Sequence, residues 1–277
     1  METWLLTIFT VGMTTVVGAI LGFFLRQIPH RFNDAILGMA AGMMLAAAIV
    51  GLILPALEQE TSWTVIQVIL GVFCGATIIS MIDQLTPHLH QLAGIDMNHH
   101  GEIPDDMSSR SDSYSESHAG REAHGLDMKG VDRVLLFVTA LAIHKFPEGL
   151  AVGVSFGTEN LGDTLTVAGS IALQNIPEGM VIIVPLLAVG VSMSRTFFIS
   201  LVIGLIEILG AAVGYSLISF TNGILPFALS FAGGTMLYVI SDEMIPETHS
   251  HGYEKMATFA LLAGFMFVLI TSHIFGA

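Results

Sequence analysis

Two short segments within apolar stretches carry nearly the same set of potential metal ligands. They read HKFPEG at 144–149 and QNIPEG at 174–179. Each places a nitrogen- or oxygen-bearing side chain four residues before a glutamate, with a proline between them and a glycine after it. On a helix, residues four apart lie about 40° from each other on one face. Ionisable groups in membrane-spanning helices are costly, so this pattern predicts a functional site.

If the two helix faces meet, four side chains converge in a small volume. His144 contributes an imidazole, Glu148 and Glu178 contribute carboxylates, and Gln174 contributes an amide oxygen. Nitrogen and oxygen ligands of this kind suit zinc, iron, manganese, cobalt or cadmium. We therefore predict a divalent metal site between the two segments.

Charge balance involves two further residues. A divalent cation is neutralised by Glu148 and Glu178, which leaves Glu207 in the sixth apolar stretch as an unpaired buried anion. Lys145 is the obvious compensator. We predict that its ammonium group occupies the place near Glu207 where a second metal would otherwise sit. We also expect Gly149 and Gly179, which each follow a motif glutamate, to leave room beside the site.

The composition is that of an integral membrane protein. Hydrophobic residues make up 53% of the 277 residues and charged residues 12%, and the mean hydropathy is +0.76. A ~30 Å hydrocarbon core requires about 20 apolar residues per helix. Such stretches predict eight transmembrane helices, at 4–25, 34–57, 63–87, 131–155, 165–188, 196–219, 223–245 and 255–275.

The basic residues predict the orientation of these helices. All but Lys145 lie in alternate loops or at their edges, namely Arg26, Arg31, Arg110, Arg121, Lys129, Arg133, Arg195 and Lys255. The positive-inside rule then places these loops in the cytoplasm and both termini outside, in the plasma membrane or the bacterial inner membrane. The chain has no basic stripe that would indicate nucleic-acid binding. Its single cysteine, Cys74, excludes a thiolate metal cluster.

A polar segment at 88–130 separates helices one to three (1–87) from helices four to eight (131–277), which together form one membrane domain. It is rich in Ser, Asp, His and Gly, so we predict that it is disordered. Six of the eleven histidines fall in this predicted cytoplasmic loop: His88, His90, His99, His100, His118 and His124. Such tracts can bind metal. The loop is either a metal sensor or acceptor, or a polar linker without a specific role.

A second polar cluster lies at the predicted cytoplasmic side of the third and seventh stretches. It consists of Asp83, Asp242, Glu243, Glu247, His249 and His251. Carboxylates and imidazoles there would form an exit route for metal. A solvated interfacial cluster explains the same residues equally well.

At these motifs the chain resembles the ZIP (Zrt/Irt-like) family of divalent metal transporters, most closely its GufA-type branch. The segments that carry the resemblance are HKFPEGLAVG at 144–153, QNIPEG at 174–179 and SDEMIPETH at 241–249. The resemblance implies an all-α fold of eight helices in a 3+2+3 arrangement, with inverted symmetry between the first and last three. It also implies homodimers, and alternating access in which a transport bundle slides against a scaffold containing the second helix.

The resemblance also assigns residues to sites. The primary metal site is matched by His144, Glu148, Gln174 and Glu178, and the second site by Lys145, Asn175 and Glu207. Lys145 departs from the Asn or Asp usual at its position, which puts a two-metal centre in doubt. Gln174 stands where many relatives have His, so the metal preference does not carry over.

We therefore predict a transporter that moves zinc, or cadmium, iron or manganese, towards the cytoplasm, with the ion as cargo and no cofactor. One rival is an intramembrane metalloenzyme with Glu148 as general base, although the chain has no His-Glu-x-x-His motif. The other rival is a proton-coupled carrier for an organic solute. ATP use is not expected, because no Walker A pattern is present.

Overall fold

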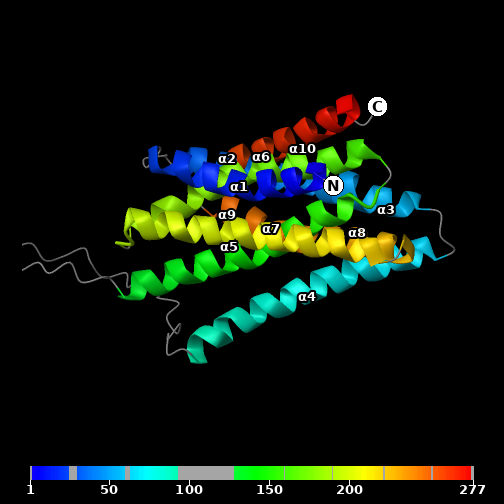
Figure 1. Ribbon diagram of the computed structural model, residues 1–277. Coiled ribbons are helices and arrows are strands. Elements are labelled where there is room, and N and C mark those ends of the chain that lie inside the picture. Colours follow the sequence, from blue (N-terminus) through cyan, green and yellow to red (C-terminus); the bar gives the residue numbers. More distant parts are fainter. Residues whose placement is uncertain are drawn as a thin grey trace, which may run out of the picture.

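The computed structural model describes residues 2–24, 30–59, 63–92, 128–158, 160–188, 190–220, 222–250 and 252–275. All regular elements in these ranges are helical, which confirms the all-α prediction (Figure 1). They are α1 (Glu2–Phe24), α2 (His30–Ala46), η1 (Ala47–Ile53), α3 (Leu54–Glu58), α4 (Thr64–Leu92), α5 (Met128–Ser155), α6 (Leu161–Ala188), α7 (Met193–Phe220), η2 (Asn222–Ile224), α8 (Leu225–Val239), η3 (Ile240–Met244), α9 (Ile245–Thr248) and α10 (Glu254–Phe275).

Part of the sequence-based prediction falls outside these ranges. The histidine-rich segment lies outside the described residues from 93 to 127, with four of its histidines and its predicted disorder. The same holds for His251. The backbone at His88 and His90 belongs to α4. The prediction for this segment therefore stays a prediction.

Six helical stretches in the described part are long and apolar enough to cross a membrane. They are Thr3–Phe24, Arg31–Glu58, Thr64–Gln84, Met193–Ile218, Leu225–Thr248 and Glu254–Ile274. The chain is therefore a multipass membrane protein. The two motif helices, α5 and α6, are each 28 residues long but are not among the six. The count of eight spans remains a prediction.

Two of the spans contain a π-helical segment that ends two residues before a proline. The segment η1 joins α2 to α3, which begins Leu54-Pro55, and η3 joins α8 to α9, which begins Ile245-Pro246. Proline cannot donate a backbone hydrogen bond, and its ring collides with the carbonyl four residues earlier. A wider π turn accommodates that ring without breaking the helix. Spans two and seven thus share a local distortion at corresponding places.

The helix packing repeats in the same symmetric way. Helix α1 packs along α6 as α7 packs along α5, and α2 packs along α10 as α8 packs along α4. If α1 is exchanged with α7, α2 with α8, α4 with α10 and α5 with α6, the set of packed pairs stays the same. The packing is the one expected of the 3+2+3 arrangement. We call α1, α5, α6 and α7 the site group, and α2 to α4 with α8 to α10 the frame group.

Backbone contacts at glycines hold each group together. In the site group, a Cβ on Gly153 or Gly210 would collide with the backbone of the opposite helix of the α5–α7 pair. In the frame group, Gly42 and Gly75 contact the backbones of α10 and α8 in the same way. Small residues allow such close approach in membranes, where packing replaces the hydrophobic driving force.

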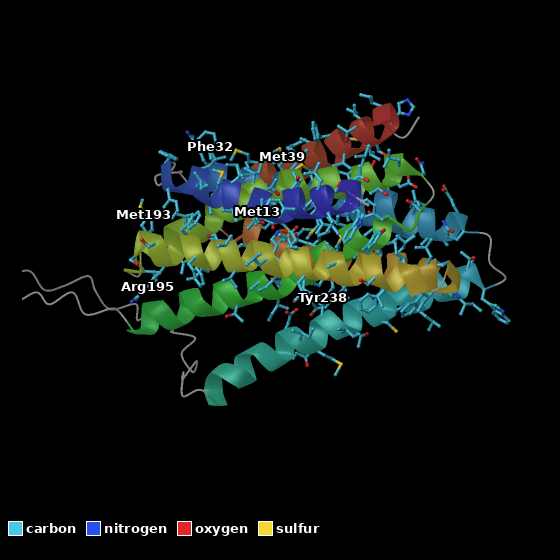
Figure 2. All side chains as sticks on the ribbon, in the orientation of Figure 1. Met13, Phe32, Met39, Met193, Arg195 and Tyr238 are labelled. Carbon is cyan, nitrogen blue, oxygen red and sulfur yellow. The ribbon has the colours of Figure 1, made fainter. Side chains whose placement is uncertain are left out.

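The two ends of the helix bundle differ. The start of α1 and the end of α10 lie at one end (Figure 1), whereas Phe32 and Arg195 lie at the other (Figure 2). Near the former end, Trp4 stacks on Tyr215 with ring centroids 4.3 Å apart, and Phe156 meets Tyr215 edge-on. The separation of the termini from Arg195 agrees with the alternation read from the basic residues.

Candidate metal site

The motif residues lie on the buried faces of α5 and α6. Both helices continue through their motif prolines. The seven residues predicted for the two metal sites are each at most 4% exposed: His144, Lys145, Glu148, Gln174, Asn175, Glu178 and Glu207. These polar groups thus face the interior, where an unpaired charge is expensive.

Gly149 and Gly179 admit neighbouring helices rather than an ion. A Cβ on Gly149 would collide with the carbonyl oxygen of Glu207 in α7, and one on Gly179 with that of Thr15 in α1. The expectation that these two glycines leave room beside the site therefore needs correction, because the backbones of α7 and α1 use that room. The glycines fix how closely α7 and α1 approach the motif helices.

The Lys145 ammonium group lies between the two motif glutamates. Its Nζ donates to Glu148 Oε2 at 2.5 Å and to Asn175 Oδ1 at 2.5 Å, and it also contacts Glu178 Oε2. Carboxylates from two helices thus converge on one cation. The predicted meeting of the two motif faces is present, with the lysine at its centre.

Glu207 is linked to this centre through Asn175. The Asn175 Nδ2 group donates to both oxygens of Glu207, at 2.7 and 2.9 Å, and to the carbonyl oxygen of Val11 at 3.1 Å. Thr15 adds a longer hydrogen bond of 3.3 Å from Oγ1 to Glu207 Oε2. Sequence reasoning missed Thr15, because a threonine in an apolar helix usually bonds its own backbone. Neutral donors therefore hold Glu207, and the Asn175 side chain lies between Glu207 and the ammonium.

His144 faces a different set of residues. Its Nε2 lies 2.9 Å from Glu243 Oε1 and 3.5 Å from Asp83 Oδ1. Neither approach has the alignment of an N–H···O hydrogen bond. The three side chains offer ligand atoms within 4.8 Å of one another, the spacing of groups that can hold one metal ion. The structure thus joins one predicted primary ligand to two residues of the predicted exit route.

Three other exit-route residues that the structure describes, Asp242, Glu247 and His249, lie outside this cluster. Asp242 and Glu247 are exposed. Both ring nitrogens of His249 already contact protein oxygens: Nδ1 lies 2.8 Å from the Ile245 carbonyl oxygen, and Nε2 lies 3.0 Å from Thr258 Oγ1. These contacts connect α9 to α10. Among the exit-route residues that the structure describes, Asp83 and Glu243 are the ones beside His144.

The Gln174 side chain is fully buried, and its amide makes no hydrogen bond within the described residues. Within the part of the chain that the structure describes, neither its Oε1 nor its Nε2 has a hydrogen-bond partner. Leaving such a group unpaired costs about 1–3 kcal/mol. A buried amide without a partner is a group that a bound ligand would satisfy.

Comparison with known proteins agrees with this arrangement. The family model described as ZIP Zinc transporter matches residues 87–272. The zinc transporter GufA of Myxococcus xanthus is 34% identical over 265 residues, which covers 94% of this chain and 93% of the relative. The zinc transporter ZIPB of Bordetella bronchiseptica is 36% identical over 274 residues, covering 95% and 78%. The human zinc transporter ZIP11 is 30% identical over 323 residues, covering 95% and 94%.

The match spans most of the chain and includes both motif helices. Together with the helical architecture and the buried carboxylates, it confirms the resemblance read from the motifs. The chain belongs to the ZIP family of transporters.

Proposed function

We propose that this protein carries zinc across the membrane towards the cytoplasm, with Glu148 and Glu178 as the principal ligands. The observation that carries the proposal is the convergence of these two buried carboxylates, from two helices, on one cation-binding position. Their two charges match a divalent ion. The relatives named above are zinc transporters. Nitrogen and oxygen ligands also suit cadmium, iron and manganese, so we include these metals among the proposed cargo.

His144 and Gln174 complete the proposed site in different ways. The Gln174 oxygen is buried without a partner and supplies a neutral ligand. The His144 imidazole lies beside Asp83 and Glu243. An ion bound to the imidazole would find these two carboxylates next on its path. We propose that His144 passes the ion from the buried glutamates to the exit route.

Alternating access would follow from movement of the site group against the frame group. Backbone contacts at glycines lock helices within each group. Across the boundary, the glycine contacts are to side chains, as between Gly51 and Val167 or Gly157 and Leu225. An apolar pocket of about 400 Å³, lined by Ile79 and other residues of both groups, lies at the same boundary. Such a boundary can slide with less disruption than interlocked backbones.

The remaining features of the proposal concern the surroundings of the protein. We place both termini outside and the histidine-rich loop in the cytoplasm, as the basic residues predict. The homodimer is proposed from the family resemblance. The helices α4 and α10 offer the surface for this dimer, because only 22% and 17% of the residues in their apolar windows are buried within the protein. The metalloenzyme rival is set aside because ZIP family members are transporters.

Zinc influx into proteoliposomes loaded with a fluorescent chelator tests the proposal. We expect the unchanged protein to transport zinc and Glu178→Ala to reduce influx by at least about 100-fold, since one of the two carboxylates is lost. Glu254→Ala, at an exposed glutamate, is the matched control and should keep its influx. Influx that survives Glu178→Ala would place the site elsewhere. Stoichiometric zinc binding without influx would argue for a sensor.

Gln174→Met should separate stability from binding. The unpaired amide costs about 1–3 kcal/mol, so its removal is expected to raise the free energy of unfolding by that order. Zinc affinity should fall, because the amide oxygen is lost. Thermal unfolding and zinc titration of purified protein measure the two effects. Gln84→Met changes an exposed glutamine and should alter neither; a loss of stability in Gln174→Met would contradict the assignment.

A further inference from the structure

The Lys145 ammonium contacts one oxygen of each of the two carboxylates that the proposed cargo uses. Its Nζ donates to Glu148 Oε2 and contacts Glu178 Oε2, and the lysine is fully buried. A divalent ion that takes Glu148 Oε2 and Glu178 Oε2 competes with the ammonium for the same two atoms, and the two positive charges repel strongly where the dielectric constant is low. Binding of cargo to these two oxygens therefore displaces the ammonium from them.

A second position for the ammonium lies within reach. Nζ already contacts Asn175 Oδ1, and the other end of the same amide holds both oxygens of Glu207. The four-carbon lysine stem is flexible and carries a compact charge. When cargo takes Glu148 and Glu178, the ammonium can withdraw along Asn175 towards Glu207. Three carboxylates, one ammonium and one divalent ion then sum to zero charge, with His144 neutral.

We infer that Lys145 is a tethered counter-ion that alternates between the two cargo carboxylates and Glu207. With the ammonium on Glu148 and Glu178, two neighbouring carboxylates share a cation, and the site group can return across the membrane without cargo. This inference rests on the proposed function and adds how the carrier resets. It differs from the prediction made from the sequence, in which the ammonium stays beside Glu207 and only replaces a second metal.

Transport kinetics separate the return step from the loaded step. Net zinc uptake into zinc-free proteoliposomes requires return without cargo, whereas exchange of radioactive for unlabelled zinc does not. In Lys145→Met, which keeps the length of the stem but removes the charge, we expect the ratio of net uptake to exchange to fall about tenfold, as a slower return step requires. Lys145→Arg keeps the charge and should restore part of the ratio.

The matched control is Lys255→Met at an exposed lysine at the start of α10, which should leave the ratio unchanged. An unchanged ratio in Lys145→Met, or equal loss of uptake and exchange, would overturn the inference. Absence of both processes in the unchanged protein would instead overturn the proposed function, and this inference with it. A zinc-bound structure tests the same point without a variant: Nζ should leave Glu148 and Glu178, and its retention there would reject the inference.

Discussion

Gly149→Ala is expected to destabilise the protein by about 3 kcal/mol, the upper end of the usual cost of overpacking. The new methyl group would collide with the carbonyl oxygen of Glu207 and lie 2.9 Å from the backbone nitrogen of Ala211. Backbone atoms cannot turn aside as a side chain can, so α5 and α7 must separate. Unfolding in detergent, followed by circular dichroism, measures the loss.

The matched control is Gly169→Ala in α6. A Cβ at this glycine would meet nothing within 4 Å. Because alanine is a better helix former than glycine, the control should gain up to about 1 kcal/mol. Effects of opposite sign are therefore expected from the same substitution. Equal effects at the two positions would contradict the close approach of α5 and α7.

His144→Ala is expected to reduce the maximal rate of zinc uptake by about 100-fold, the upper end of the effect of losing a residue that supports a metal site. The change removes a proposed ligand and leaves Asp83 and Glu243 without the imidazole beside them. Glu148 and Glu178 remain, so zinc should still bind, although more weakly. Uptake measured over a range of zinc concentrations, beside equilibrium zinc binding, separates rate from affinity.

His273→Ala provides the comparison, because His273 is exposed near the end of α10. Its uptake should equal that of the unchanged protein. If His144→Ala lost binding and rate in equal measure, the imidazole would act only as a ligand. If it changed neither, the ion would not pass the imidazole at all.

The sequence was sufficient to predict the buried motif faces but not the contacts between them. Helical periodicity placed Lys145 and Glu148 on one side of α5, and the repeated motif predicted that α6 would meet that side. Which atoms Lys145 reaches depends on the separation of α5 and α6, and periodicity along one helix contains no such distance. Thr15 escaped notice as well, because a threonine in an apolar helix usually bonds its own backbone, and its contact here is with Glu207 on another helix.

The polar cluster at 83 and 242–251 shows the same limit. The sequence indicated these residues as a set, but packing selects among them. Asp83 and Glu243 lie beside His144, while His249 is engaged between α9 and α10. The choice depends on how α4 and η3 pack around α5, which lies far from either in sequence.

The stacking of Trp4 on Tyr215 has a practical consequence. The chain contains two tryptophans, and they fall in different groups: Trp4 belongs to α1, and Trp63, which is 65% exposed, directly precedes α4. After Trp63→Phe, the remaining indole would sit entirely in the group proposed to move. Its emission, and its quenching by brominated lipids at chosen depths, would report the position of that group in the bilayer without an added dye.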